Sequence, residues 1–405
     1  MGSDDAWGAP GEEDWLSPRR LSAGSPGPGG PGLGRRGRIA LRVGVGFVVV
    51  VLVAGFVASR WVVPYYAITP GTALNVGQLI SVPRDAAPAH RGSFVLTDVS
   101  LIHLTALGYL YYRFDQRAEI VSAAELTGGA SSAAYDEQGV VEMAKARQSA
   151  ALVALRELGY HPRAVPSGVV VFADLPGAAS AMTLPVGDVI TAVGSARTSS
   201  LSQLVAAIGV VAPGRSTTLT FHMLGSGTSR TKSVIVGELR SSGPSSATVY
   251  TCAKVGSTTG RLVRRKGRAV SCLPVYGEQL DTDTNEPFRV SINADGIVGP
   301  SAGLSFTLGL IEKLDRGDLT GGRRIAATGT IANNGSIGEI GGIAQKTIAV
   351  REAGATVFLV PRGNAAAARG NAGPDLRIIT VSSIGQALRA LERLGGRLVP
   401  APGAR

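Results

Sequence analysis

The chain has 405 residues, 44% of them hydrophobic, so it is long and apolar enough for two or three packed domains and is not a disordered protein overall. Its formal net charge of +11 would suit nucleic acid, but only 5% of the residues are aromatic and no nucleic-acid motif accompanies the basic residues. Most of these are arginines scattered along the chain, which we interpret as a surface facing anionic lipid or wall polymer. We therefore expect no nucleic-acid partner.

The first 59 residues indicate a tail followed by a membrane anchor. Residues 1–38 are rich in Gly, Pro and Ser with few apolar anchors, which is typical of a disordered tail. Residues 39–59 are mostly aliphatic and match the roughly 20 residues that a transmembrane helix needs. The basic residues that flank this segment are Arg35, Arg36, Arg38 and Arg42 at its start and Arg60 at its end. By the positive-inside rule, this excess at the start places the N-terminus in the cytoplasm and the bulk of the chain outside.

A cleaved secretory signal is the alternative for residues 39–59. Their apolar run exceeds the usual signal core of about 7–15 residues, and no clear Ala-x-Ala site follows it. We therefore expect a single-pass protein of the cell membrane that contacts lipid through this helix.

We expect residues 60–163 to form an α/β region outside the membrane. Residues 92–99 are typical of a strand, and residues 137–158 have the apolar spacing of a helix. Five tyrosines form either an interfacial or peptide-binding belt or, as is more usual, core or interface packing. These tyrosines are Tyr65, Tyr66, Tyr109, Tyr111 and Tyr112.

Residues 164–240 show short strand patterns, such as 168–172, and a predicted helix at 201–210. The segment 184–194 reads Leu-Pro-Val-Gly-Asp-Val-Ile-Thr-Ala-Val-Gly and resembles the Gly-Asp-x-Ile-x-x-Val strand and turn of bacterial PDZ domains. Such domains bind an extended peptide by adding it as a strand to a sheet edge. A Gly-Leu-Gly-Phe type of carboxylate loop is not evident, so a PDZ-like, β-rich domain that only gates its neighbour is the alternative.

We predict that residues 241–289 are a linker that carries the chain's two cysteines. Cys252 and Cys272 lie twenty residues apart in a part expected outside the membrane, where an oxidising compartment favours a disulfide. By restricting the loop, that bond would add about 3 kcal/mol of stability. Two free thiols are the alternative. No metal site is expected, because neither cysteine has a CxxC partner or a nearby histidine.

A glycine-flanked serine stands in the segment Gly299-Pro300-Ser301-Ala302-Gly303. The same Gly-x-Ser-x-Gly spacing marks the α/β-hydrolase nucleophile, which needs an acidic residue and then a histidine later in the chain. All four histidines of this chain precede Ser301, so that order cannot be built. Another general base is needed.

Lys346 is the predicted base, 45 residues after Ser301. A lysine accepts a serine proton only when it is neutral, and lowering its pKa by burial from ~10.4 to about 7.5 costs roughly 4 kcal/mol. The other residues between Ile343 and Val350 are uncharged and belong to a predicted apolar helix. The alternative base, Lys313, lies about 18 Å from Ser301 along another predicted helix, at ~1.5 Å per residue, and cannot reach the serine.

The elements expected after Ser301 alternate between helix and strand, which predicts a mixed α/β domain over residues 290–399. The expected helices are 302–314, 343–353 and 384–394, and the expected strands are 324–331, 356–361 and 376–381. The site would lie between the starts of the first two helices. Pro300 suits a first helical turn, whose unpaired N–H groups predict an oxyanion hole near Ser301.

These residues resemble the Lon-type serine proteases, which use a Ser/Lys dyad. Besides 299–303, the match includes 328–346, which begins Thr-Gly-Thr-Ile, ends Gly-Gly-Ile-Ala-Gln-Lys and looks like the lysine-bearing block of that family. The resemblance implies that Ser301 is the nucleophile, Lys346 the base and Thr328 the residue that holds the lysine.

Two features favour the membrane-anchored, PDZ-containing branch of that family over the ATP-dependent branch. The ATP-dependent members have an acidic residue before Gly-Pro-Ser, where this chain has Val298. The chain also contains no Gly-Lys dipeptide, so it cannot build the phosphate-binding loop Gly-x-x-x-x-Gly-Lys-Ser/Thr. We therefore expect no nucleotide and no other cofactor.

The sequence thus predicts an ATP-independent, membrane-anchored serine endopeptidase of secreted or membrane-tethered proteins or peptides, with a PDZ-like domain for substrate binding or gating. The residues alone predict only acyl transfer, and it is the resemblance that implies a peptide bond as the substrate. The alternative is a proteolytically inactive PDZ-bearing membrane adaptor that captures peptides uncut. A basic scaffold on wall polymer would depend on charge alone. The family often forms rings, which leaves a homo-oligomer open.

Overall fold

The computed structural model describes residues 35–82, 91–129, 131–174, 184–224, 228–242, 249–252, 270–273, 275–283, 290–294 and 296–399. The chain divides into two units, residues 1–58 and 59–405. The expected disordered tail up to position 34, and residues 253–269 of the expected linker, lie outside the described residues.

Helix α1 (Arg35–Arg60) supplies the described residues of the first unit, up to Ala58. Its segment Arg42–Arg60 is long and apolar enough to cross a membrane, which agrees with the helix expected at 39–59. Apolar side chains such as Phe47 and Leu52 are exposed along it. A helix that is apolar on all sides needs an apolar environment, and a bilayer core provides one.

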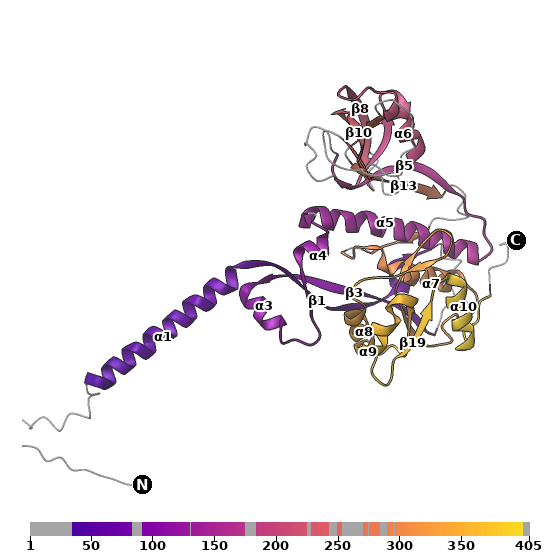
Figure 1. Ribbon diagram of the computed structural model, residues 1–405. Coiled ribbons are helices and arrows are strands. Elements are labelled where there is room, and N and C mark those ends of the chain that lie inside the picture. The colour runs from indigo at the N-terminus through magenta and orange to yellow at the C-terminus, as the bar shows by residue number, and fades with distance from the viewer. Residues whose placement is uncertain are drawn as a thin grey trace, which may run out of the picture. The chain divides into compact units, whose positions relative to one another are not determined.

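The second unit contains a six-stranded sheet with the strand order β19-β18-β15-β3-β1-β4 (Figure 1). These strands are β1 (Val62–Asn75), β3 (Ser93–Thr105), β4 (Glu119–Ser122), β15 (Arg324–Ala327), β18 (Val357–Pro361) and β19 (Arg377–Val381). The four strands from β3 to β19 pair in parallel, whereas β1 pairs antiparallel with β3 and with β4. The sheet therefore contains both parallel and antiparallel pairs.

Helices cover both faces of this sheet. One face carries α5 (Ser132–Glu157), α7 (Gly303–Leu314) and α10 (Ile384–Arg393), and the other carries α8 (Ile343–Glu352) and α9 (Ala365–Asn371). Each face of the sheet packs with its helices into a hydrophobic core. Neighbouring residues of β3 point alternately into these two cores: Phe94 and Leu96 pack with α5 and α7, whereas Val95 packs with α8 and α9. Two covered faces explain why β18, which lies between β15 and β19, is buried along its whole length.

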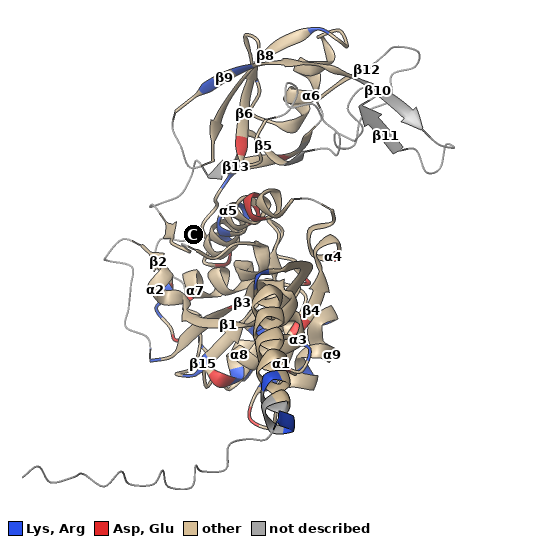
Figure 2. Ribbon diagram, turned by 90° about the vertical axis from the view of Figure 1, so that its left-hand side faces the viewer, with Lys and Arg blue, Asp and Glu red and all other residues tan. Residues whose placement is uncertain are grey.

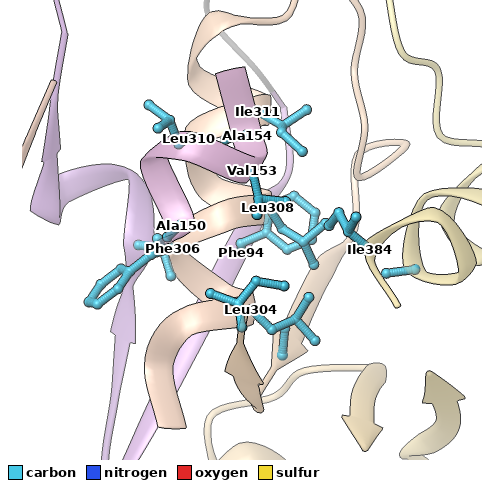
Figure 3. Packing of buried hydrophobic residues seen from close by; sticks show 14 of the residues in the cluster. Phe94, Ala150, Val153, Ala154, Leu304, Phe306, Leu308, Leu310, Ile311 and Ile384 are labelled. Atoms are coloured by element: carbon cyan, nitrogen blue, oxygen red, sulfur yellow. The ribbon is translucent and has the colours of Figure 1, made fainter. Parts of the chain in front are cut away.

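Helix α7 lies inside the larger core. Each of its residues except Lys313 is buried. Figure 3 shows Leu304, Leu308 and Ile311 of this helix among side chains of α5, β3 and α10. A short 3-10 helix, η2 (Pro300–Ala302), leads directly into α7, so the packing of α7 holds the segment that carries Ser301.

Residues 60–163, which we expected to form a region of their own, share a core with residues 290–399. They supply β1, β3 and β4 to the six-stranded sheet, and β3 pairs in parallel with β15 through Phe94 and Ile325. The sequence analysis missed this pairing, because a parallel partner more than 200 residues away leaves no local signal in either strand. The expected boundary therefore does not separate two domains.

A second sheet, with the order β13-β5-β6-β8-β9, forms the β-rich domain. Its elements are β5 (Ala164–Asp174), β6 (Asp188–Val193), β7 (Ala196–Arg197, paired with β6), α6 (Leu201–Gly209), β8 (Ser216–Met223), β9 (Arg230–Ile235) and β13 (Val275–Asp283). Leu204 and Ile208 of α6 pack against Val169 and Ile190 of the sheet. Because β13 comes from the segment expected to be a linker, that segment closes one edge of this domain.

Shorter elements complete the described chain. They are α2 (Val76–Leu79), β2 (Ile80–Ser81), α3 (Ala106–Tyr112), α4 (Ala123–Thr127), β10 (Gly237–Ser242), β11 (Val249–Cys252), β12 (Val270–Cys272), β14 (Ser291–Ile292), β16 (Thr330–Ile331), β17 (Ile337–Gly338) and η3 (Arg362–Asn364). A turn joins β16 to β17, and its Gly335 has a φ of +80°, which a side chain would disfavour. Cys272 is disulfide-bonded, and Cys252 is the other cysteine of the chain.

Replacing Phe94 by Ala should lower the free energy of unfolding by about 3–5 kcal/mol, because this buried side chain fills the core that β3 shares with α7. The exposed Val140 of α5 supplies the matched control, for which we expect a change within about 0.5 kcal/mol on substitution by Ala. Thermal unfolding of the full chain in detergent, followed by circular dichroism, measures both. Equal melting temperatures for the two variants would contradict a shared core.

Candidate active site

The segment around Ser301 is shaped by its two glycines. Gly299, just before η2, has a φ of +88°, a conformation that L-amino acids with side chains rarely adopt. A Cβ on Gly303 would lie 2.7 Å from the Cγ2 and 2.9 Å from the backbone nitrogen of Ile331. Glycine therefore permits the turn before the serine and the close approach of α7 to β16 after it.

Lys346 reaches Ser301 from the other face of the sheet. It lies in the second turn of α8, and only 3% of its surface is exposed. Its Nζ lies 2.8 Å from Ser301 Oγ and donates a second hydrogen bond, of 3.0 Å, to the backbone carbonyl oxygen of Thr97. The structure thus brings together the two residues that the sequence analysis paired.

Thr97 is a site residue that the sequence analysis missed. It lies on β3, 249 positions before Lys346, and contributes a backbone carbonyl rather than a side chain. No residue type is required for that contact, so the sequence carries no signal for it; the contact follows from the place of β3 in the sheet, beside β15.

The pKa of Lys346 is lowered from 10.5 to about 8. Burial is the main cause, because removal from water disfavours the ammonium form, and the nearby carboxylate of Asp98 opposes the shift. A substantial fraction of the amine is therefore neutral near pH 8. A neutral amine has a lone pair that can accept the proton of the Ser301 hydroxyl.

Thr328 contacts the serine rather than the lysine. Its Oγ1 donates a 3.1 Å hydrogen bond to the backbone carbonyl oxygen of Ser301, and the N–H of Gly329 donates to the same oxygen at 2.9 Å. The resemblance implied that this threonine holds Lys346. In the structure Thr328 instead fixes the backbone of Ser301, because it comes directly after β15, whose end lies beside η2.

A cavity of about 300 Å³ opens at the dyad. Parts of β1, β3, α4 and α5, the segment 296–301 and the start of α8 line it. Asp98, Asp136 and Glu142 are among the lining residues, so its wall carries several carboxyl groups. Burial raises the pKa of Glu142, and the neighbouring Lys145 partly offsets that rise. The space beside Ser301 can hold part of a substrate.

Helix α5 borders this cavity and contacts the serine segment directly. The carbonyl oxygen of Gly139 accepts a 2.8 Å hydrogen bond from the N–H of Gly299. A Cβ on Gly139 would come within 3.1 Å of the Val298 side chain, so a small residue suits this contact. The position of α5 therefore bears on the shape of the site.

Two further points concern Asp295 and metal binding. Asp295, which precedes the serine segment, lies outside the described residues. Among the residues that the structure describes, no group of three or more His, Cys, Asp and Glu side chains could hold a metal ion.

Comparisons with known proteins identify the domain that carries this site. Residues 288–392 match the Lon protease (S16) C-terminal proteolytic domain. The Lon protease of Chloroflexus aggregans is 33% identical to this chain over 123 residues, which cover 28% of this chain and 15% of that protein. The matched part contains Ser301, Thr328 and Lys346, whereas Thr97 lies outside it. These findings confirm the resemblance for the proteolytic domain alone.

Replacing Lys346 by Met should remove a pH dependence from the stability of the fold. Because the folded-state pKa of about 8 lies below the unfolded value of 10.5, the unfolded chain binds more protons between these values, and stability rises with pH there. Relative to Lys346→Met, the wild type should gain roughly 1 kcal/mol per pH unit in this window. Urea unfolding at pH 8, 9 and 10 measures the difference. Ser301→Ala, which keeps the lysine, is the control and should follow the wild type; equal slopes in all three proteins would contradict a depressed pKa.

Replacing Thr328 by Val should lower the reactivity of Ser301 about fivefold, because one hydrogen bond to the Ser301 carbonyl, worth about 1 kcal/mol, is lost without a change of volume. Thr328→Ser keeps the hydroxyl and should retain most of the activity. The rate of covalent labelling of Ser301 by a serine-reactive phosphonate is the measurement. If Val and Ser variants are labelled at the same rate, this hydrogen bond does not position the nucleophile.

Proposed function

Since residues 288–392 are a Lon-type (S16) proteolytic domain, we propose that this chain is a membrane-anchored, ATP-independent serine endopeptidase of secreted or membrane-tethered proteins or peptides. Ser301 is the nucleophile and Lys346 the general base. One observation carries the proposal: the buried amine of Lys346 lies 2.8 Å from the hydroxyl of Ser301.

The reaction begins when neutral Lys346 accepts the hydroxyl proton and Ser301 Oγ attacks the carbonyl carbon of the peptide bond. The lysine then donates that proton to the leaving amine, the C–N bond breaks, and an acyl ester remains on Ser301. Water, deprotonated by the same lysine, attacks the ester and releases the acid product. The hydrogen bond to the Thr97 carbonyl holds Nζ in place during these steps.

Backbone N–H groups at the start of α7 are the proposed oxyanion donors. Pro300 stands in the first turn of η2, and α7 continues from it, so the N–H groups of Ser301 and Ala302 belong to a helix N-terminal end. Such an end stabilises the negative charge that the substrate oxygen gains during attack.

The ATP-independent assignment is supported by the sequence of this chain. It contains no Gly-Lys dipeptide, so a phosphate-binding Gly-Lys-Ser/Thr loop cannot be built from it. The chain matches only 15% of the length of the Chloroflexus Lon protease, and the activity of that whole protein is not carried over.

We assign the β-rich domain of residues 164–283 to substrate binding or gating. Its sheet ends in two edge strands, β13 and β9, and an extended peptide binds to a sheet edge as an added strand. A gating role is supported by α5, whose Lys145 forms a salt bridge with Glu278 of β13 while its Gly139 bonds to Gly299. A movement of β13 would therefore reach the serine segment through one helix.

Anchorage through α1 is supported by its length and exposed apolar side chains. The arginine excess before the span supports a cytoplasmic N-terminus and an extracytoplasmic protease. Protein or peptide substrates on that side are the proposed partners. Figure 2 shows Lys and Arg on separate elements of the described chain, including β9 and α5.

The alternative is an inactive adaptor that uses the β-rich domain to capture peptides without cutting them. The geometry of Ser301, Lys346 and Thr328 argues against it, because an inactive fold has no need for a buried lysine whose desolvation disfavours its charged form. Recovery of uncut peptides on the wild type, without any covalent adduct on Ser301, would favour the adaptor.

Ser301→Ala and Lys346→Ala should each abolish peptide cleavage and covalent labelling while leaving the fold intact, because one lacks the nucleophile and the other its base. Intact mass spectrometry of the full chain after incubation with a serine-reactive phosphonate is the measurement, with the adduct mapped by peptide digestion. Ser100→Ala on β3 and Lys313→Arg on α7 are the matched controls and should label like the wild type. A Lys346→Ala protein that still turns over substrate would rule out the dyad.

The value of kcat/KM should rise about tenfold per pH unit below pH 8 and level off above about pH 9, because only the neutral lysine accepts the serine proton and its pKa is about 8. Initial cleavage rates of a fluorogenic peptide between pH 5.5 and 9.5 measure the profile, and circular dichroism confirms that the fold persists over this range. A rate that is already maximal at pH 6 would contradict Lys346 as the base.

A further inference from the structure

Helix α3 (Ala106–Tyr112) and the turn after it present an apolar stripe to solvent. Leu107, Leu110 and Tyr111 lie on one face of α3, at intervals of three and four residues, and Phe114 in the turn after it lines the same surface hollow. Their exposed fractions range from 46% to 79%. A surface helix of a soluble domain normally turns such a stripe toward the core, and an outward stripe marks an interaction site.

The orientation of α3 is fixed from its other side. Thr105 caps the helix, because its Oγ1 accepts the N–H of Gly108 at 3.1 Å. The Tyr109 ring packs on Tyr65 of β1 with centroids 5.1 Å apart. These contacts divide the tyrosine belt of the sequence analysis: Tyr65, 37% exposed, and Tyr109 pack on each other, whereas Tyr111 is 67% exposed. The stripe is therefore held outward rather than left there by a loose helix.

The chain itself places this stripe close to the end of α1. The N–H of Ala106, the first residue of α3, donates a 2.8 Å hydrogen bond to the carbonyl oxygen of Trp61. Trp61 follows Arg60, the last residue of α1, and its own side chain is exposed. Where α1 spans a bilayer, Trp61 lies at the membrane surface by covalent continuity, and the start of α3 lies beside it.

We propose that the outward stripe of α3 inserts into the interface of the leaflet from which Trp61 emerges. Amphipathic helices bury their apolar face about 5–10 Å into that boundary, and Trp and Tyr are enriched there. Arg113, exposed at the end of the helix, can contact anionic headgroups. The proposal rests on the proposed anchorage through α1. It adds a second membrane contact, which fixes how the proteolytic domain faces the bilayer.

The test uses single-tryptophan variants of the full chain in vesicles of phosphatidylcholine and phosphatidylglycerol with brominated acyl chains, which quench tryptophan on contact. The three natural tryptophans, Trp7, Trp15 and Trp61, are first replaced by Phe. Tyr111→Trp reports the stripe. Val210→Trp is the matched control, because Val210 is 85% exposed but stands after α6 in the β-rich domain. Phe47→Trp reports whether α1 is in the bilayer.

Bromination should reduce the fluorescence of Tyr111→Trp about twofold or more, with bromine near the headgroup acting more strongly than deep bromine, and should leave Val210→Trp unchanged. Replacing Leu110 and Phe114 by Ser in the Tyr111→Trp protein should weaken that quenching.

Three results would decide against the proposal in distinguishable ways. An unquenched Phe47→Trp would remove the anchorage itself. Quenching of Phe47→Trp, together with equal responses at positions 111 and 210, would overturn insertion of α3 and leave the anchor intact. A tryptophan at 111 that neither brominated lipid nor aqueous acrylamide quenches would mean that a second copy of the chain covers the stripe instead.

Discussion

The burial of one amine, Lys346 Nζ, is the constraint on which the rest of the site depends. Desolvation lowers its pKa to about 8 and so makes the neutral base available, but only because the surrounding layers exclude water from it. Below that pH the same burial works against the fold, since a charged amine must then be kept away from water. The structure accepts this cost beside Ser301, where the stability of the fold and the proposed activity make opposite demands on one group.

Three layers meet at this amine. Helix α8 delivers the lysine from one face of the sheet, η2 and α7 deliver Ser301 from the other, and β3 between them supplies the Thr97 carbonyl. Each element is held by its own core: α7 by the cluster shown in Figure 3, and α8 by the apolar side chains beneath it. Residues far apart in the chain can therefore be fixed within hydrogen-bonding distance, because packed interiors leave little freedom for any one layer to shift.

The sequence predicted the local elements of the proteolytic domain well, because each carries its own signal. Helix α7 starts after Pro300, α8 starts after Gly342, and β18 and β19 are short apolar runs, so their bounds agree with expectation to within a few residues. The pairing of Ser301 with Lys346 was also predictable. Every histidine precedes Ser301 in the chain, which excludes the order that α/β-hydrolases use, and Lys313 lies too far from Ser301 along its helix. The long-range pairings were not predictable. β3 beside β15, and β13 beside β5, join segments whose own residues do not specify a partner, and the contact of Thr328 with the Ser301 backbone depends on the first of these pairings.

The partner that orients the lysine is a main-chain atom, and every amino acid carries that atom. Substitution at position 97 changes the side chain but leaves the carbonyl oxygen in the strand. A scan of side chains would therefore not remove the contact between Lys346 and this carbonyl. Sequence variation at this position between relatives would likewise carry no information about its importance. The contact requires only that β3 keep its position in the sheet, and this position is a property of the fold rather than of any residue in the strand.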